Sequence, residues 1–512
     1  MEPALVGLPH SRAKLGAGGG INGMLLLLGF NAAIGGFLFG YDTGSMSSAL
    51  LQVKRPRNPM DACPGLAPHK LSSVQQELVI SFVVLGAFLG AIASGYLNPY
   101  YGRRRLLIGA SLLFIAGDCF EASAKSLGAM LVARVIVGLG VGISSHTVPL
   151  YIAECAPAHL RGSLCFLNDM MVTVGQVTSA FVSTMFFSWE VRAGWRWILG
   201  FAACPSSCML VGFWFMPESP RWLISRGRHD EAKAILRSLR RLATEDQLEE
   251  EFHNTITGTC EETPLNDSQA GIGYAWERYV KDTRVRRALL LGCGLQCLQQ
   301  SAGINTIMYY GASVLQKTGG NTGPRSCFSA ESKQDVAITM LFAAGQLVGV
   351  FFSWLLVDRL GRRPLLLGSL VGVTVSLFAT GCAFHQEFVN QGAVVVCILA
   401  YLVCFGAGLS PVPWTVNAEI YPLHVRAQCV SLSTCTNWSM NFIVSQTFLS
   451  LARALSLDPE HPKSHPDGIF LLYAGIASVG MVFAWFRMPE TKGLSLEQIG
   501  DLFVAGEGLR AK

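Results

Sequence analysis

The stretch MLLLLGFNAAIGGFLFGYDTGSMSSALL, residues 24–51, decides the fold of this chain. It is apolar and long enough to cross a bilayer as one helix, which takes about 20 such residues. Asp42 is its only charged residue, and an ionised carboxylate in hydrocarbon costs about 2.5–3.5 kcal/mol. A residue of that cost must have a partner, a proton or a function.

The composition of the whole chain indicates a polytopic membrane protein. Of its 512 residues, 51% are hydrophobic and only 14% are charged, whereas about a quarter of a soluble chain is charged. Apolar runs recur and predict an all-α membrane protein with twelve transmembrane helices in two six-helix halves. The predicted spans are 24–51, 75–98, 105–124, 127–151, 164–187, 195–216, 288–312, 335–357, 364–385, 391–415, 427–452 and 467–488.

The polar stretch between the halves predicts a helical linker. Apolar residues recur in it at helical spacing beside charged ones: Ala232, Ile235, Leu236 and Leu239. Lysines and arginines near the span ends place the linker and both termini in the cytoplasm. The predicted divisions are an N-terminal tail (1–23), the N-terminal half (24–216), the linker (217–287), the C-terminal half (288–488) and a C-terminal tail (489–512).

Three short signatures occur twice in the same order. Gly102-Arg103-Arg104 recurs as Gly361-Arg362-Arg363, an offset of 361 − 102 = 259 residues. Glu154 and Arg161 recur as Glu419 and Arg426, and Pro217-Glu218-Ser219 recurs as Pro489-Glu490-Thr491. Two copies of a six-helix unit with one membrane orientation are implied. Parallel repeats of this kind build secondary transporters, whose substrate site lies near the midplane between the halves.

These signatures also predict a cytoplasmic gate. Positive charge at cytoplasmic helix ends would by itself explain the arginines. Each copy also carries glutamates, however, and guanidinium–carboxylate pairs between helix ends can close one side of a transporter and break when it opens. The predicted gate residues are Arg103, Arg104, Glu154, Arg161 and Glu218 in the first copy, and Arg362, Arg363, Glu419, Arg426 and Glu490 in the second.

Arg134 is the predicted partner of Asp42. It is the only arginine of span 127–151 and lies at a depth similar to that of Asp42. A carboxylate beside a guanidinium favours its ionised form, and one parted from it in a dry environment favours its protonated form. The pair is therefore a candidate proton-coupling device, and a static salt bridge between two helices is the alternative. Asp118 and Glu121 are rival carboxylates near an outer helix end, where interfacial solvation would explain them.

Span 288–312 is rich in side-chain amides. Gln296, Gln299 and Gln300 share one helix face, and Asn305 follows in the same uncharged run. Amides both donate and accept hydrogen bonds, which suits a neutral, hydroxyl-rich ligand, whereas a phosphate or carboxylate would call for arginine. Amide contacts between helices are the alternative explanation. Trp414 and Trp438 offer aromatic faces on which a pyranose or cyclohexane ring can pack.

The cysteines carry no metal signal. Most of the 15 fall in apolar runs without metal-ligand spacing, which is typical of small buried hydrophobic residues. Cys63 and Cys327 lie in polar loops, and the sequence leaves open whether they form a disulfide. No nucleophile–base pair is recognisable in the predicted core. We therefore expect a protein that is no enzyme and needs no cofactor or metal.

Four motifs make the chain resemble the sugar porter family of the major facilitator superfamily over essentially its whole length. They are Gly102-Arg103-Arg104, PESPRW at 217–222, Gln299-Gln300 with Gly303-Ile304-Asn305, and PETKG at 489–493. Segment 292–310 is most similar to proton/myo-inositol cotransporters. Asp42 stands where the family's proton symporters have aspartate and its facilitative glucose carriers have asparagine.

The resemblance implies a substrate site between the halves. Its hydrogen-bonding or stacking residues would be Gln176, Gln299, Gln300, Asn305, Trp414 and Asn437, and its cavity would be lined by Phe39, Tyr310 and Trp438. Two positions depart from the family pattern. Gln346 stands where an asparagine of the site is usual, and Pro99 where the wider superfamily has an aspartate in its first arginine motif.

These observations predict a proton-coupled symporter of myo-inositol or a related hexose or polyol that works by alternating access. The first alternative is a hexose (glucose) transporter, which would be facilitative if Asp42 merely holds Arg134. A transporter-like nutrient sensor is the second, and the short tail after Lys492 disfavours it. The expected partners are the polyhydroxylated substrate, protons and the lipid bilayer, with no nucleic acid. We expect a monomer in the plasma membrane with both termini cytoplasmic.

Overall fold

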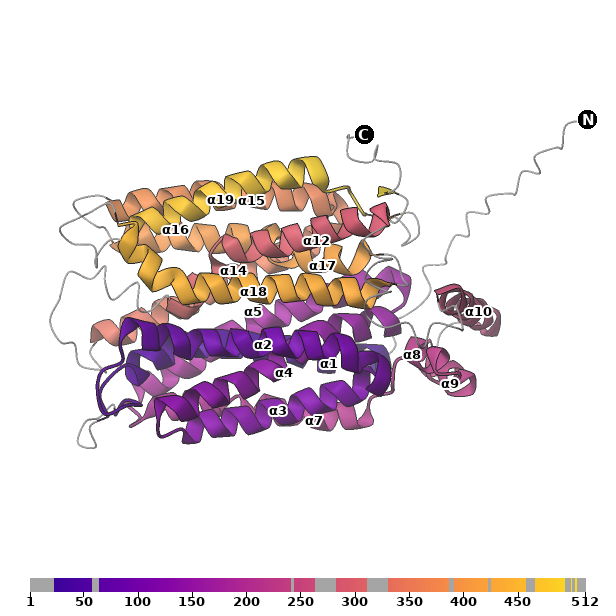
Figure 1. Ribbon diagram of the computed structural model, residues 1–512, viewed down its shortest axis with the longest axis horizontal. Coiled ribbons are helices and arrows are strands. Elements are labelled where there is room, and N and C mark those ends of the chain that lie inside the picture. Colours follow the sequence, from indigo (N-terminus) through magenta and orange to yellow (C-terminus); the bar gives the residue numbers. More distant parts are fainter. Residues whose placement is uncertain are drawn as a thin grey trace, which may run out of the picture.

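The computed structural model shows long, roughly parallel helices in two groups that lie against each other (Figure 1). The structure describes residues 23–57, 64–240, 244–262, 282–310, 330–385, 391–421, 425–456 and 466–492, with 499 and 502–503. Within these ranges every regular element is a helix, and the only β pairing is an isolated bridge between Pro56 and Ala67. Cys63 and Cys327 lie outside the described residues.

The first group holds the six spans of the N-terminal half. They are α1 (Gly23–Val53), α2 (Ser73–Tyr101), α3 (Arg103–Ser123), α4 (Leu127–Cys155), α5 (Ala158–Ser188) and a last span made of α6 (Gly194–Gly200) and α7 (Ala203–Phe215). A capping box between Ser72 and Gln75 starts α2. Gly102, at φ +84°, separates α2 from α3, a backbone conformation that glycine adopts at little cost.

Three short helices lie beyond one end of the bundle (Figure 1): α8 (Pro220–Ser225), α9 (His229–Leu239) and α10 (Glu245–Glu262). Ser219 caps α8 by accepting a hydrogen bond from the Trp222 N–H. Trp222, Ile224 and Ala232 pack into a small core of their own. All three helices lie within residues 217–287, the stretch predicted as a linker. We call this end of the bundle the linker end and the opposite one the far end.

The second group holds the six spans of the C-terminal half. They are α12 (Thr283–Ser301) with a continuation at 304–310, α14 (Ala330–Leu360), α15 (Arg362–His385), α16 (Gln391–Cys404) continued by the π turn η2 (Phe405–Leu409) and α17 (Pro411–Glu419), α18 (Arg426–Ala454) and α19 (Asp467–Arg487). The groups meet along α2 against α18 and along α5 against α14.

All twelve predicted spans are occupied by helices. In the described part of the chain, ten of these segments are long and apolar enough to cross a membrane. The other two are α12, which begins with Arg284, Arg286 and Arg287, and α18, which carries a series of hydroxyl and amide side chains. Several polar residues of α18 are buried, for example Asn437 and Asn441, whereas Arg284 and Arg286 are exposed at the start of α12.

Three of the twelve spans are broken. Span 195–216 turns at 201–202, span 288–312 turns at 302–303, and span 391–415 contains η2. Gly303 has φ +83°, and a Cβ there would lie 2.5 Å from the Tyr473 ring. Pro411 and Pro413 follow η2 and lack the N–H that a regular helix would use. Gly303, Pro411 and Pro413 mark two of these breaks, whereas the break at 201–202 was not predicted.

Helices of one half touch backbone to backbone. In the contact of α1 with α5, a Cβ at Gly40 would lie 1.8 Å from the carbonyl oxygen of Val172. In the contact of α2 with α4, a Cβ at Gly138 would lie 2.2 Å from the carbonyl oxygen of Val83. Small residues allow such close approach, which drives helix association where lipid replaces water.

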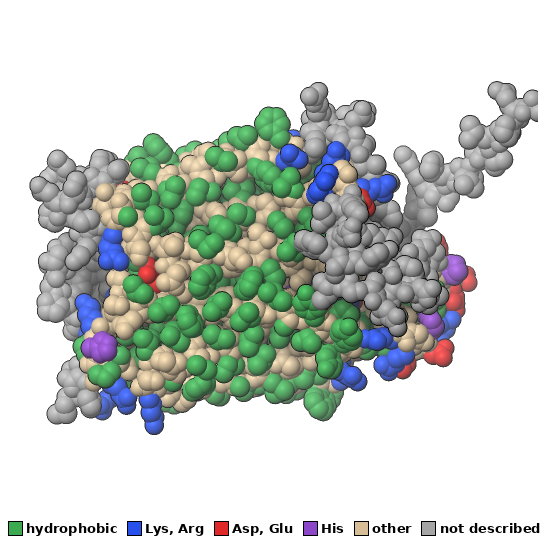
Figure 2. Space-filling view, in the orientation of Figure 1, with side chains coloured by type: hydrophobic (Ala, Val, Ile, Leu, Met, Phe, Trp, Pro, Cys, Tyr) green, Lys and Arg blue, Asp and Glu red, His purple; other side chains and the backbone are tan. Residues whose placement is uncertain are grey.

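The outer surface is that of a membrane protein. Figure 2 shows hydrophobic side chains over the middle of the bundle, with Lys and Arg towards its ends. Large apolar side chains point outward, such as Phe215 and Val479, which are 74% and 72% exposed. Lipid makes this exposure favourable, so the chain is a multi-pass membrane protein.

Candidate functional site

Asp42 lies against Arg134 in the interior of the first half. Arg134 Nη1 donates to Asp42 Oδ1 at 2.5 Å, and Nε donates to the carbonyl oxygen of Val79 at 3.1 Å. The Arg134 side chain is completely buried and that of Asp42 is 9% exposed. The two residues that the sequence pairs are therefore brought together by α1 and α4.

Arg134 has a second acidic partner, Glu121 of α3. Its Oε1 accepts from the same Nη1 at 3.2 Å, and the residue is 1% exposed. Asp118, one turn earlier, is 4% exposed and accepts from Ser206 Oγ at 3.2 Å. Interfacial solvation therefore does not explain these two acids, and that prediction is wrong. A helix end near the membrane surface can still be covered by its neighbours, here by α4 and α7.

The amides of α12 meet α18 at Asn437. Asn437 Nδ2 donates to Gln296 Oε1 at 2.6 Å and to Gln299 Oε1 at 2.9 Å, while its Oδ1 accepts from Gln300 Nε2 at 3.0 Å. Asn305 Nδ2 completes the set by donating to Gln300 Oε1 at 2.6 Å. All five residues are buried. The predicted binding amides thus hydrogen-bond to one another.

The same amides cap the broken helix of the second half. Gln299 Nε2 donates to the carbonyl oxygens of Leu409 and Ser410 at 3.2 and 2.7 Å, where η2 gives way to α17. The Leu409 carbonyl loses its usual partner because residue 413, four positions later, is a proline without an N–H. Trp414 follows in α17 and is half-buried.

Other predicted site residues surround this network. Phe39 and Trp438 pack edge to face across the two halves at 5.2 Å, and Trp438 Nε1 donates to Ser145 Oγ at 3.3 Å. Tyr310 donates its hydroxyl to the carbonyl oxygen of Ser445 at 3.1 Å, so this hydroxyl is already engaged. Gln176 of α5 and Gln346 of α14 are buried, and the Oε1 of each accepts no hydrogen bond.

Asp169 of α5 is a site residue that the sequence analysis missed. Ser410 Oγ lies 3.2 and 3.4 Å from its two carboxylate oxygens, which links the first half to the broken helix of the second. The available signal was a lone acid inside the span 164–187. Intramembrane acids are expensive and mark functional positions by default.

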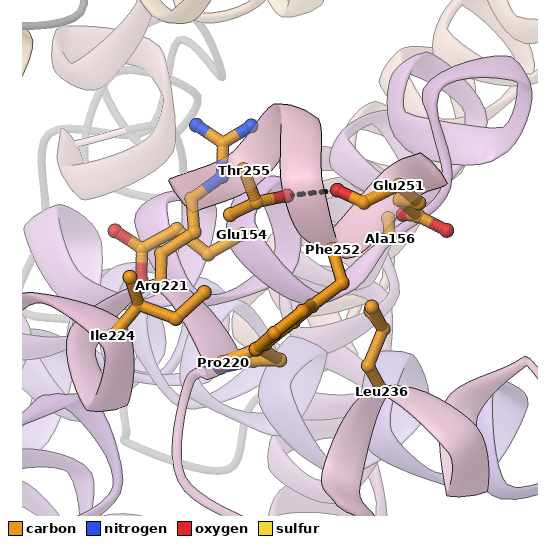
Figure 3. Close-up of a pocket in the computed structure, with 9 residues that line it drawn as sticks. All are labelled: Glu154, Ala156, Pro220, Arg221, Ile224, Leu236, Glu251, Phe252 and Thr255. Carbon is orange, nitrogen blue, oxygen red and sulfur yellow. Dashed lines mark hydrogen bonds between the residues drawn. The ribbon is translucent and has the colours of Figure 1, made fainter. Parts of the chain in front are cut away.

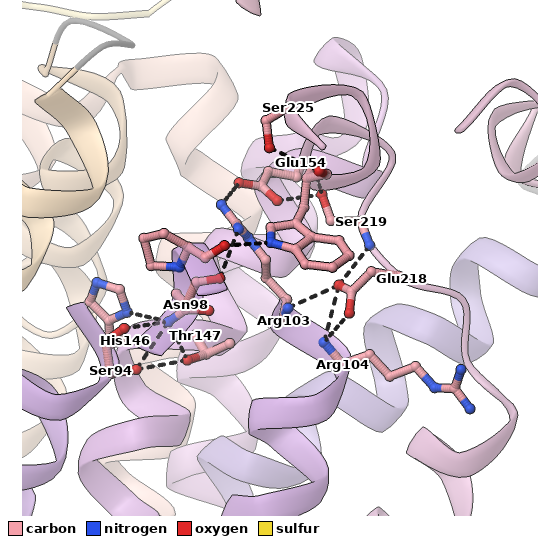
Figure 4. Close-up of polar contacts among 12 residues, drawn as sticks. Ser94, Asn98, Arg103, Arg104, His146, Thr147, Glu154, Glu218, Ser219 and Ser225 are labelled. Carbon is pink, nitrogen blue, oxygen red and sulfur yellow. Dashed lines mark hydrogen bonds and ion pairs between the residues drawn. The ribbon is translucent and has the colours of Figure 1, made fainter. Parts of the chain in front are cut away.

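Arg103, Arg104, Glu154 and Glu218, the predicted gate residues of the first half whose side chains are described, lie together at the linker end (Figure 4). Arg103 Nη2 donates to Glu154 Oε1 at 2.6 Å, and Ser219 Oγ donates to the other oxygen of Glu154. Glu218 Oε1 accepts from the N–H groups of Arg103 and Arg104 at 2.9 and 3.2 Å. Burial raises the pKa of Glu218, and these backbone hydrogen bonds oppose the shift.

The second half repeats this arrangement. Arg362 Nη2 donates to Glu419 Oε1 at 3.1 Å, Thr491 donates to Glu419, and Glu490 accepts from the N–H groups of Arg362 and Arg363. Arg363 Nη2 itself donates to the carbonyl oxygen of Trp485. The glycine of the repeated signature is required for the same reason in both copies. At Gly102 and Gly361 φ is positive, and a Cβ would lie 2.5 Å from Glu218 and Glu490, respectively.

Two gate predictions need qualification. Arg161 lies in α5, but its side chain is outside what the structure describes. Arg426 donates to the carbonyl oxygen of Tyr421 at 3.0 Å and so caps the end of the preceding segment. Pro99, where an aspartate was noted as missing, supplies its carbonyl oxygen to Trp222 Nε1 at 2.9 Å. Neither guanidinium–carboxylate pair joins the two halves: Arg103–Glu154 lies within the first half and Arg362–Glu419 within the second.

A small cavity lies beside the first gate (Figure 3). It is lined by Glu154 and Ala156 at the end of α4 and by residues of α8–α10: Pro220, Arg221, Ile224, Leu236, Glu251, Phe252 and Thr255. Arg240 closes one side by donating to Glu251 and to the carbonyl oxygen of Cys155 at 3.0 Å. The cavity lies between the end of α4 and the linker helices, and none of its lining residues belongs to the amide network of α12 and α18. No cluster of metal ligands occurs among the described residues.

Comparisons with known proteins agree with this architecture. The profile of the family described as "Sugar (and other) transporter" matches residues 28–503. The chain is 35% identical to the proton myo-inositol cotransporter of Homo sapiens, over 92% of this chain and 81% of that one. It is 33% identical to myo-inositol transporter 1 of Cryptococcus neoformans, over 94% and 81%. The major facilitator superfamily proton:xylose symporter XylE of E. coli, bound to 6-bromo-6-deoxy-D-glucose, superposes with a TM-score of 0.78 at 25% identity, over 94% of this chain and 99% of that one. The chain therefore belongs to the sugar (and other) transporters, the sugar porter family of the major facilitator superfamily.

Proposed function

We propose that this protein is a proton-coupled symporter of myo-inositol or a related hexose or polyol that works by alternating access. The observation that carries the proposal is the buried contact between Asp42 and Arg134. A carboxylate at this depth is costly unless it is paired or protonated, and proton coupling uses both states. In this scheme the linker end faces the cytoplasm and the protein acts in the plasma membrane as a monomer.

The proton step takes place at Asp42. With the carboxylate ionised, Arg134 holds α1 against α4. When Asp42 binds a proton, the attraction to the guanidinium falls, and the two helices are free to move relative to each other. Tyr309, four residues after Asn305, interacts with Asp42, Arg134 and the neighbouring Thr43. It provides a direct route from the proton site to the amide-rich segment of the other half.

The substrate step takes place at the amide network. A cyclic polyol carries several hydroxyls, each a donor and an acceptor, and these can replace the amide–amide bonds of Gln299, Gln300 and Asn437 one for one. The vacant Oε1 atoms of Gln176 and Gln346 add two acceptors. Aromatic faces of Trp414 and Trp438 would cover the ring carbons. Myo-inositol is the first candidate substrate because both relatives described above are named for it.

The gate step follows from the paired signatures at the linker end. Arg103–Glu154 and Arg362–Glu419 each tie two helix ends within a half. We propose that these pairs stabilise the state in which the linker end is closed. Opening towards the cytoplasm would then break or rearrange both, together with the contacts of Glu218 in the linker and of Glu490 after α19.

A facilitative hexose carrier is the second candidate. One observation favours it: Arg134 is also held by the carbonyl oxygen of Val79, which makes the Asp42–Arg134 contact part of a fixed three-helix junction. In that case Asp42 would stabilise the fold without exchanging protons.

Uptake in proteoliposomes separates the two. Labelled myo-inositol should accumulate faster under an inward proton gradient, and Asp42→Asn should abolish accumulation while leaving exchange of labelled for unlabelled substrate intact. Asp246→Asn, on the exposed face of α10, is the matched control and should behave as the wild type. If Asp42→Asn still concentrates substrate, Asp42 is structural. Competition by glucose, fructose and xylose in the same assay ranks the substrates.

A further inference from the structure

Arg134 faces two carboxylates from two different helices. Its Nη1 lies 2.5 Å from Asp42 Oδ1 on α1 and 3.2 Å from Glu121 Oε1 on α3. Both acids are nearly or completely shielded from solvent, with side chains 9% and 2% exposed. A coupling pair needs only one acid, so the second one requires an explanation.

The charges of this trio do not balance when both acids are ionised. Two carboxylates and one guanidinium carry a net charge of −1 in a buried site, whereas one bound proton makes the trio neutral. Isolated charges are poorly tolerated in a dry environment, so the neutral, singly protonated trio is the favoured state. With Asp42 alone, the same proton would instead leave the guanidinium of Arg134 without a counter-ion.

The guanidinium also has a free side. Arg134 Nη2 is buried and has no hydrogen-bond partner among the residues that the structure describes, while Nε is held by Val79 and Nη1 contacts both acids. Guanidinium groups bind carboxylates best through two parallel N–H groups. The unused Nη2 therefore leaves room for Arg134 to change from a shared contact to a two-point contact with one acid.

We propose that Glu121 is a positioning residue of the proton-coupling site, which takes over the guanidinium of Arg134 when Asp42 binds its proton. The proton from the outer solution forms an O–H bond on the Asp42 carboxylate, and that acid leaves Arg134. The guanidinium remains protonated and moves onto the ionised Glu121, so no bond other than hydrogen bonds is broken. This inference rests on the proposed proton coupling. It explains how Asp42 can be protonated without leaving the buried guanidinium of Arg134 without a counter-ion.

Other titratable groups face Glu121 without replacing it. Asp118 lies on the same helix but is bonded to Ser206 of α7. From α6, Arg196 is directed to the carbonyl oxygen of Ala122 at 2.6 Å. From α1, Tyr41 donates to the carbonyl oxygen of Ile198, and from the second half Tyr309 approaches Asp42 and Arg134. Among these groups, Glu121 is the acid that shares Arg134 with Asp42.

The test is the pH profile of gradient-driven myo-inositol uptake by Glu121→Gln. With Glu121 neutral, Asp42 becomes the sole counter-ion and is harder to protonate. The pH of half-maximal uptake should therefore fall by about one unit, which is a tenfold higher proton concentration. Asp118→Asn, a buried acid of the same helix without a bond to Arg134, is the matched control and should shift the profile by less than about a third as much. Glu121→Asp keeps the charge but withdraws it from Arg134 by one methylene, so it should shift the profile in the same direction by less than Glu121→Gln does.

The outcomes separate this inference from the function on which it rests. If Asp42→Asn loses accumulation while Glu121→Gln keeps the wild-type profile, the role of Glu121 is overturned and proton coupling stands. If Asp42→Asn still accumulates substrate, proton coupling itself fails. Should Glu121→Gln lose exchange at every pH, Glu121→Asp decides: a smaller shift in the same direction supports the proposal, and an unchanged profile overturns it.

Discussion

Replacing Glu154 by Gln should open the linker end of the first half more often. Glu154 ends α4 and accepts from Arg103 Nη2 at 2.6 Å and from Ser219. The side chains of Arg103 and Glu154 are only 12% and 9% exposed. Gln has nearly the same shape, but it removes the charge and replaces one of the two acceptor oxygens by an NH2 group that cannot accept from Arg103 or Ser219.

The size of the effect follows from the charge. A hydrogen bond to a charged group contributes about 1.5–3 kcal/mol and a neutral one about 0.5–1.5 kcal/mol. The closed state should therefore lose on the order of 1–2 kcal/mol, which makes opening about 5–30-fold more frequent. Glu231 provides the matched control, since Arg228 Nη2 lies 2.5 Å from its Oε2 but the two side chains are 47% and 55% exposed. Exposed pairs contribute little, so Glu231→Gln should leave the gate unchanged.

Amide hydrogen exchange reports the opening directly. The N–H groups of Arg103 and Arg104 are bound to Glu218 in the closed state and become exchangeable when the helix ends separate. Peptides that cover residues 98–105 should exchange about 5–30-fold faster in Glu154→Gln than in the wild type. Equal exchange rates in Glu154→Gln and Glu231→Gln would refute the idea that this pair holds the end closed.

Two further substitutions probe packing and binding. Gly40→Ala should lower the unfolding temperature, at a cost of about 1–3 kcal/mol for overpacking against Val172. Gly109→Ala meets no atom within 4 Å and should leave the unfolding temperature unchanged or higher, so similar losses in both would contradict the close-packing argument. Asn437→Ala leaves three glutamines short of a partner and should weaken myo-inositol binding about 5–100-fold, from about 1–3 kcal/mol per unsatisfied group. Ser439→Ala, which bonds only within α18 at Cys435, is its control in an equilibrium binding assay, and equal affinities would remove Asn437 from the site.

The long apolar spans were predictable because length and composition alone specify them. The predicted span 75–98 became α2 at Ser73–Tyr101, and 364–385 became α15 at Arg362–His385. The pairing of signatures in the two halves also follows from sequence, since a repeated motif in a repeated fold makes the same contacts. The turn at 201–202 was not predicted, because Gly200 and Pro205 on its two sides lie in an apolar run that has the composition of one continuous span.

The candidate site was predictable where a residue is costly in its own helix. Asp42 and the amides of α12 stand out in apolar runs, whereas Glu121 could be discounted because it lies near a helix end. Whether such an acid is solvated depends on neighbouring helices, which one segment of sequence does not reveal. The same holds for Asp169, whose partner Ser410 lies 241 residues away in the other half.

The side-chain amide of Gln299 contacts both the predicted substrate site and the broken helix of the second half. Its Oε1 accepts from Asn437, and its Nε2 donates to the carbonyl oxygens of Leu409 and Ser410. A sugar hydroxyl that replaces the Asn437 contact, as proposed, would act on the same rigid amide plane that holds those carbonyls, so substrate binding and the bend of α16–η2–α17 become linked through one side chain.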